Sequence, residues 1–154
     1  MAMPLPAPVE PSGRAYWTQG DVRALPDDGH RYELVHGELL VSPAPRKLHQ
    51  EVVGDLYFLL KSRLAGHPVG AVYASPAELT FGADTLVQPD VFVLTPEAAA
   101  SRQWNTLGEV LLIAEILSPS TARHDRFQKR RAYQEAAVPL YWIVDPDARQ
   151  VEVW

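Results

Sequence analysis

Hydrophobic residues in the first half of the chain change from strand-like to helix-like spacing. A short helix is expected around residues 17–25. Two β-prone runs at 32–35 and 38–41 flank His36 and Gly37, and a glycine after a polar residue in this position predicts a hairpin. From Arg46 to Leu64 the apolar side chains recur at helical spacing, which predicts a long helix with one broad apolar face.

Strand-like runs dominate the second half. We expect strands at 71–74, 78–81, 86–94, 110–117, 140–144 and 150–154. The run at 110–117 is almost continuously apolar, which is typical of a strand covered on both faces. One helical turn is expected at 96–100, and the hydroxyls of 118–121 are expected to cap a helix over 122–137. This order predicts an α/β (α+β) fold, a mixed central β-sheet flanked by helices.

Composition limits the chain to one globular unit. Its 154 residues suffice for one domain with one core, which we place at 15–154. Residues 1–14 contain four prolines and no signal-peptide pattern, so we expect a disordered leader there. No apolar run approaches the ~20 residues that would span a bilayer, so no membrane association is expected. The sequence has no cysteine, which excludes disulfides and thiolate chemistry and suits a cytoplasmic location.

Charge is uneven along the chain. The formal net charge of −5 argues against a protein that coats nucleic acid by bulk electrostatics. However, five of the 14 basic residues fall within one short segment, at Arg123, Arg126, Lys129, Arg130 and Arg131. A solvated helix face is one interpretation of this segment, and a nucleic-acid-binding patch is the other.

Two carboxylates interrupt apolar strands. Glu115 is the one polar residue between Val110 and Leu117, and Asp90 follows Pro89 and opens the run from Val91 to Leu94. An unpaired buried carboxylate is costly, so Glu115 must be paired, neutral, metal-bound or at a strand end that reaches solvent. Asp90 taken alone would suit a turn. If the two strands are neighbours, both side chains can converge on one hard cation.

Three further residues are candidates for the same site. Lys129 shares a helix face with Asp125 and Tyr133, so it either forms a routine ion pair with Asp125 or points back over the sheet. Glu38 follows the hairpin turn, although this residue and Glu33 are more typical of solvent-facing positions. His49 lies on the apolar side of the long helix, as a core histidine or as part of the site. The histidines show no zinc-hydrolase spacing.

Several segments together resemble one family. They are Tyr32 to Leu39, Gln88-Pro89-Asp90-Val91, Ala114 to Thr121, Asp125 with Lys129 and Tyr133, and Val138 to Pro146. They are similar, in the same order, to the Uma2 family of bacterial proteins in the PD-(D/E)XK restriction-endonuclease-like superfamily. Relatives usually continue with more strand beyond the position of Trp154, so we expect an incomplete sheet edge.

The resemblance implies a nuclease. Asp90 would be the aspartate of the PD motif and Glu115 the acidic residue of the second strand. Leu117 occupies the position where the superfamily pattern has lysine, and Lys129 would replace that lysine from the following helix. The implied activity is hydrolysis of nucleic-acid phosphodiesters, with DNA expected. Asp90, Glu115 and a backbone carbonyl near Ile116 would hold Mg²⁺ or Mn²⁺.

The resemblance also implies roles for Lys129, Glu38 and the basic helix, and two other functions stay open. Lys129 would act on the water or the developing charge, Glu38 would add a ligand or contact, and the basic helix would contact phosphates. A homodimer is a candidate assembly. One alternative is a catalytically idle fold that serves a mobile or defence element as a DNA-binding or interaction module. Another is a structural metal site that needs only Asp90 and Glu115.

Overall fold

The computed structural model describes residues 7, 13–101 and 107–154. The expected leader at 1–14 therefore lies almost entirely outside the described residues. The elements in chain order are α1 (Gln19–Arg23), β1 (Arg31–Val35), β2 (Glu38–Ser42), α2 (Lys47–Ala65), β3 (Ala71–Ala74), β4 (Leu79–Phe81), β5 (Thr85–Val87), β6 (Val91–Leu94), α3 (Pro96–Ala100), the 3₁₀ turn η1 (Leu107–Glu109), β7 (Val110–Ile116), the π-helical segment η2 (His124–Lys129), α4 (Arg130–Glu135), β8 (Leu140–Asp145) and β9 (Gln150–Val153).

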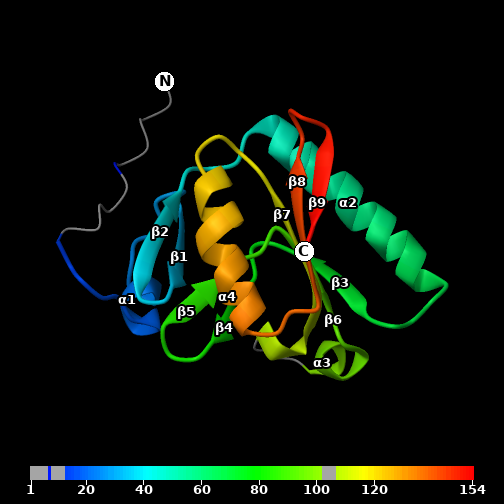
Figure 1. The fold of residues 1–154 in the computed structure, drawn as a ribbon, viewed down its shortest axis with the longest axis horizontal. Coiled ribbons are helices and arrows are strands. Elements are labelled where there is room, and N and C mark those ends of the chain that lie inside the picture. Colours follow the sequence, from blue (N-terminus) through cyan, green and yellow to red (C-terminus); the bar gives the residue numbers. More distant parts are fainter. Residues whose placement is uncertain (1–6, 8–12, 102–106) are drawn as a thin grey trace.

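The strands form two sheets. The hairpin sheet has the order β2-β1-β5-β4 and is antiparallel throughout. The central sheet has the order β3-β6-β7-β8-β9, in which β7 and β8 are parallel and the other neighbours are antiparallel. The expected mixed central sheet is thus confirmed, and the predicted hairpin belongs to a second sheet beside it (Figure 1).

Helices cover both faces of the central sheet. Val53 of α2 packs against Val91 and Ala114 on one face. On the other face, Tyr133 of α4 packs in the main core with Ile113. Figure 1 shows α4 in front of β7, between the two sheets, and α2 behind the central sheet. The main core also includes side chains of the hairpin sheet, so α4 is enclosed by both sheets. No helix in the described part of the chain is long and apolar enough to cross a membrane.

The single strand expected at 86–94 is wrong. β5 ends at Val87 and β6 begins at Val91, and the two strands belong to different sheets. Pro89 has no N–H to donate to a ladder. The backbone N of Gln88 donates to the side-chain Oε1 of Glu33 on β1 at 2.7 Å instead of to a backbone carbonyl of a neighbouring strand. The chain therefore crosses from one sheet to the other at Asp90.

The expected helix at 122–137 also differs in detail. Residues 124–129 form a π-helix, and the α-helix α4 follows it. The predicted hydroxyl cap is wrong, because Oγ1 of Thr121 accepts from the backbone N of Ser118 and the three hydroxyls of the turn hydrogen-bond to one another. No side chain caps the π segment.

Candidate active site

Asp90 lies at the crossing between the two sheets and accepts hydrogen bonds from three elements. Its side chain is 1% exposed. Nη1 of Arg31 lies 2.9 Å from Oδ1, the backbone N of Ile116 lies 2.9 Å from Oδ2, and Nε2 of His49 lies 3.1 Å from Oδ2. Burial opposes ionisation of Asp90, but the His49 hydrogen bond and the charge of Arg31 outweigh it. The pKa of Asp90 therefore lies well below its ordinary value.

Glu115 lies beside Asp90 on the neighbouring strand. Val91 pairs with Ala114 across β6 and β7, so Asp90 and Glu115 come next along the same antiparallel register. The backbone N of Asp90 donates to Oε2 of Glu115 at 3.3 Å, and the Tyr133 hydroxyl donates to Oε1 at 2.7 Å. Complete burial raises the pKa of Glu115 well above its ordinary value, although the Lys129 ammonium acts against this shift.

Lys129 is surrounded by carboxylates. Its Nζ lies 2.8 Å from Glu33 Oε2, 3.2 Å from Glu115 Oε1 and 3.4 Å from Asp125 Oδ1. Burial acts to lower the pKa of Lys129, but the three carboxylates raise it well above its ordinary value. Lys129 is therefore a permanent cation near neutral pH. Both interpretations of the sequence apply to its placement, since Lys129 pairs with Asp125 and also points back over the sheet.

The π-helical segment η2 brings two of these groups into the cluster. Asp125 and Lys129 both lie in it and are both buried. The Tyr141 hydroxyl donates to the backbone O of Asp125 at 2.7 Å, which fixes the segment to β8. Burial raises the pKa of Asp125. Single π-helical turns within α-helices are often found at functional sites.

The cluster holds more acidic than basic groups. Four carboxylates, Glu33, Asp90, Glu115 and Asp125, are buried with Lys129, and Arg31 pairs with Asp90 at their edge. Full ionisation would leave two negative charges unbalanced. The raised pKa values of Glu115 and Asp125 express this repulsion together with burial. Oε2 of Glu33 and Oδ1 of Asp125 have no hydrogen-bond partner among the described residues, although both lie within ion-pair distance of Lys129.

The structure brings three of the four predicted site residues together, and Glu38 is the exception. Glu38 is exposed and accepts a hydrogen bond from Nε2 of Gln128 at 2.7 Å. Glu33 is the hairpin residue that reaches the cluster, so the expectation that it faces solvent is wrong. Two adjacent apolar residues follow Glu33, but two also follow the exposed Glu38, so the sequence holds no signal that separates the two glutamates. His49 joins the site through Asp90.

Pockets reach the cluster from the side of Asp90. A pocket of about 400 Å³ is lined by Asp90, Arg31 and His49 among others. A second pocket of about 240 Å³ shares Arg31 and His49 and extends to the turn at 118–121. Neither is lined by Glu115 or Lys129. Asp90 and Arg31 therefore separate the inner part of the cluster from these pockets.

The donor set fits a hard divalent cation. Carboxylate oxygens suit Mg²⁺ and Mn²⁺, and such an ion would supply the two positive charges that the cluster lacks. Within the described residues, no three His, Asp or Glu side chains form a ligand set for one ion. This does not conflict with magnesium, which usually takes one or two carboxylates and completes its shell with water and substrate phosphate. Asp90 lines the larger pocket, and its backbone N donates to Glu115.

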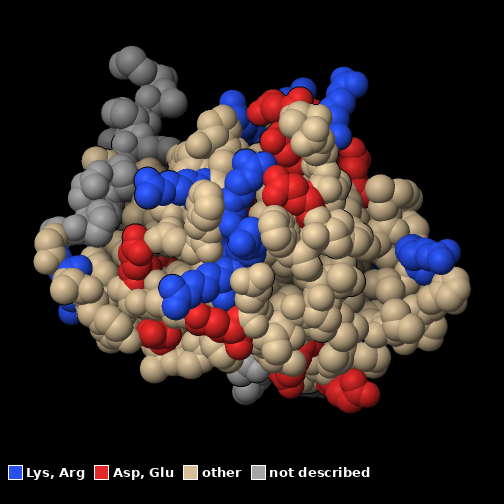
Figure 2. Space-filling view, viewed as in Figure 1, with Lys and Arg blue, Asp and Glu red and all other residues tan. Residues whose placement is uncertain are grey.

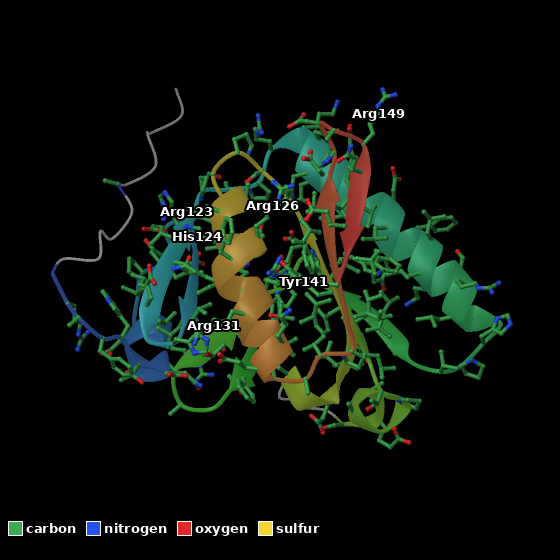
Figure 3. The ribbon with its side chains drawn as sticks, in the orientation of Figure 1. Arg123, His124, Arg126, Arg131, Tyr141 and Arg149 are labelled. Carbon is green, nitrogen blue, oxygen red and sulfur yellow. The ribbon has the colours of Figure 1, made fainter. Side chains whose placement is uncertain are left out.

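The basic segment is only partly available to a partner. Figure 2 shows a stripe of Lys and Arg side chains over α4. Arg126 points toward β9 (Figure 3) and pairs with Glu152 at 2.6 Å, and Arg131 pairs with Glu135 at 2.9 Å. Arg130 stacks on the ring of Trp154. Because Lys129 is internal, Arg123 and Arg130 are the members of the segment without a carboxylate partner in the described part of the chain.

Comparison with known proteins gives the family and the fold of this chain. None of the curated proteins compared with this chain matches it. Its fold is similar to that of a crystal structure described as a putative nuclease belonging to DUF820 from Anabaena variabilis. The TM-score is 0.76 at 20% sequence identity, over 90% of this chain and 79% of the other. The Uma2 family model, described as "Putative restriction endonuclease", matches residues 20–154. The chain therefore belongs to the Uma2 family.

Proposed function

We propose that this protein is a metal-dependent nuclease that hydrolyses phosphodiester bonds of nucleic acid, with DNA as the expected substrate. One observation carries the proposal: Asp90, Glu115 and Lys129 converge in a buried acidic cluster next to two pockets. The family description supports the same class of reaction.

Asp90 and Glu115 would hold Mg²⁺ or Mn²⁺. The bound ion would polarise the phosphate and lower the pKa of a water molecule that attacks it. Arg31, His49 and the backbone N of Ile116 fix the orientation of the Asp90 carboxylate. Tyr133 and Lys129 do the same for Glu115. Both carboxylates are thus positioned before a ligand arrives, which reduces the cost of reorganisation during reaction.

Lys129 has a role that follows from its protonation. Because its pKa is raised, it remains an ammonium ion and cannot remove a proton from water at neutral pH. It can donate hydrogen bonds and stabilise negative charge that develops on the phosphate. Lys129 pairs with three carboxylates and lines neither pocket. We therefore expect it to act from the side of Glu115 that faces away from the pockets.

The test is cleavage of several substrates by the purified full chain. Supercoiled, linear and single-stranded DNA, and RNA, are incubated with Mg²⁺, Mn²⁺ or EDTA. We expect the wild type to nick at least the supercoiled DNA with Mn²⁺ and none of them with EDTA, and Asp90→Asn to be inactive. Glu109→Gln is the matched control. Glu109 is exposed and lies directly before the first residue of β7, at the other end of the strand from Glu115.

The outcomes separate this proposal from its rival. DNA binding without cleavage of any substrate would overturn the nuclease and favour the idle DNA-binding module. Equal cleavage by Asp90→Asn and Glu109→Gln would mean that the nuclease activity comes from a contaminant or from another part of the molecule.

A further inference from the structure

One of the two pockets has a lining suited to an anion. The pocket of about 240 Å³ lies between the segment 43–46, which precedes α2, and the turn 118–121, which follows β7. Its polar lining consists of Arg31, Arg46 and His49 with the hydroxyls of Ser118, Ser120 and Thr121. The described residues that line it include no aspartate or glutamate. It therefore differs from the acidic cluster, which lies behind Asp90.

Arg31 connects this pocket to the cluster. Both of its hydrogen bonds, to Oδ1 of Asp90 at 2.9 Å and to the backbone O of Gln88 at 3.0 Å, come from Nη1. In the described structure, no hydrogen bond from Nε or Nη2 is found, so three N–H donors on that edge of the guanidinium remain for a ligand. The planar fork of an arginine matches two oxygens of a phosphate. The Asp90 contact holds the fork in place.

The other walls add charge and hydrogen-bonding groups. Arg46 is exposed and has no ion pair among the residues that the structure describes. Across the pocket, the hydroxyl of Ser118 lies 3.1 Å from that of Ser120 and 3.0 Å from that of Thr121. Hydroxyl groups can turn their protons toward a ligand oxygen.

A histidine nitrogen beside the pocket lacks a partner. His49 is 8% exposed, and its Nε2 is engaged by Asp90. Its Nδ1 is buried without a hydrogen bond in the described structure. Buried polar atoms nearly always have a partner in proteins. In a neutral imidazole whose Nε2 donates to Asp90, Nδ1 is an acceptor, so a bound water or a hydroxyl group can supply its partner but a phosphate oxygen cannot.

We infer that this pocket binds a phosphate group of the nucleic-acid backbone, with Arg31 and Arg46 as its principal donors. The inference rests on the proposed function for the identity of the ligand, and it adds a substrate-binding site to the carboxylates. A phosphate held on Arg31 lies directly next to Asp90, so the pocket would place the substrate strand at the edge of the cluster. Arg31 would thus contact Asp90 and the substrate phosphate at the same time.

The test measures binding and cleavage by the full chain with five proteins: wild type, Arg31→Lys, Arg31→Gln, Arg46→Gln and Arg63→Gln. Arg63 is exposed near the far end of α2 and controls for the loss of one positive charge. Binding of a fluorescently labelled DNA duplex is followed in Ca²⁺ at several salt concentrations, and inorganic phosphate is added as a competitor. Cleavage is measured in Mn²⁺, and melting temperatures report folding.

We expect Arg31→Gln to bind the duplex about 10- to 100-fold more weakly, since hydrogen bonds to charged groups contribute roughly that much. Arg31→Lys keeps the charge and the contact with Asp90 but loses the fork, so it should melt near the wild type and bind about tenfold more weakly. Arg46→Gln should reduce the slope of log affinity against log salt by about 0.9, the value for one lost phosphate contact. Arg63→Gln should change neither the affinity for the duplex nor the salt slope.

Affinities and salt slopes of Arg31→Lys and Arg46→Gln equal to those of Arg63→Gln would overturn the inference, even if the wild type cleaves DNA. Weaker binding by both variants would support it even if no protein cleaves, and only the nuclease activity would then fail. If inorganic phosphate displaces the duplex and binds more tightly than the duplex does, the inference would be overturned in favour of a site for free phosphate. A wild type that binds neither ligand would overturn it outright.

Discussion

At the scale of single residues, Lys129 balances the negative charge of the buried carboxylates. Its ammonium group is the one cation that contacts Glu33, Glu115 and Asp125 together. Removal of one partner of a buried ion pair is far more costly than removal of a surface ion pair, because the remaining charges are neither hydrated nor balanced. Loss of Lys129 should therefore cost more stability than the loss of a surface ion pair with Asp125 alone would.

Substitution of Lys129 by methionine should lower the free energy of unfolding at pH 7 by roughly 3–5 kcal/mol. In this variant Glu115 and Asp125 lose their cation, so their pKa values in the folded protein rise further above those of the unfolded chain. A raised carboxyl pKa is a penalty at higher pH, and the penalty disappears as the pH falls toward the ordinary value near 4. The deficit should thus be smaller at pH 5 than at pH 7.

Urea denaturation at the two pH values measures this difference. Lys61→Met is the control, because Lys61 is exposed on α2 and its ammonium group contacts Tyr57 and no carboxylate in the described part of the chain. It should cost less than about 0.5 kcal/mol at either pH. Similar costs for both variants, or a Lys129→Met deficit that grows on acidification, would contradict the account of the buried cluster.

At the scale of elements, two local irregularities build the site. The break at Gln88, Pro89 and Asp90 moves the chain between sheets and leaves Asp90 at the crossing. The π segment η2 carries Asp125 and Lys129 to the same point from the other side. Regular elements supply the other members of the cluster, with Glu33 on β1 and Glu115 on β7.

The sequence predicted the regular elements better than these irregularities. Continuous apolar runs identified β7, and Asp90 and Glu115 were visible as polar breaks within such runs. Periodicity does not show that Pro89 separates strands of different sheets, because that depends on which neighbour accepts each ladder bond. Nor does it distinguish Glu33 from Glu38, since both lie in short β-prone runs and only tertiary packing buries one of them.

Deletion of Phe127 tests the role of the π segment. Phe127 is 66% exposed, so its side chain contributes little packing. Loss of one residue from a π turn returns the helix to α spacing and places Lys129 three residues after Asp125 instead of four, which changes the direction of its side chain relative to Asp125. We expect the deletion to lower the free energy of unfolding by at least about 3 kcal/mol, as for a broken buried ion pair.

The matched control is deletion of Ala148, which lies in the exposed turn between β8 and β9. Surface turns tolerate changes in length better than packed helices. Equal stability of the two deletion variants in urea denaturation would mean that the π segment does not position Lys129.

At the scale of the whole molecule, two sheets and two helices enclose an acidic centre, and basic side chains line its outer side. The net charge of −5 does not show this separation. Some of the surface basic groups are neutralised by carboxylates, as Arg126 is by Glu152. Attraction of the proposed nucleic-acid substrate would therefore depend on local groups such as Arg31, Arg46 and Arg123 more than on the overall field. The excess of buried carboxylates at the centre suits a divalent cation.

The central claim is that Glu115 belongs to a metal-dependent nuclease site, and a single-turnover measurement tests it most directly. Cleavage of supercoiled DNA in Mn²⁺ is compared for wild type, Glu115→Gln and Glu109→Gln, all with melting temperatures recorded. Glutamine keeps the shape of Glu115 and an oxygen that can accept from Tyr133 and Lys129, but it removes the charge. The account predicts a rate loss of at least about 100-fold for Glu115→Gln, typical of losing one essential group, and none for Glu109→Gln. A folded Glu115→Gln protein that cleaves as fast as Glu109→Gln would contradict it.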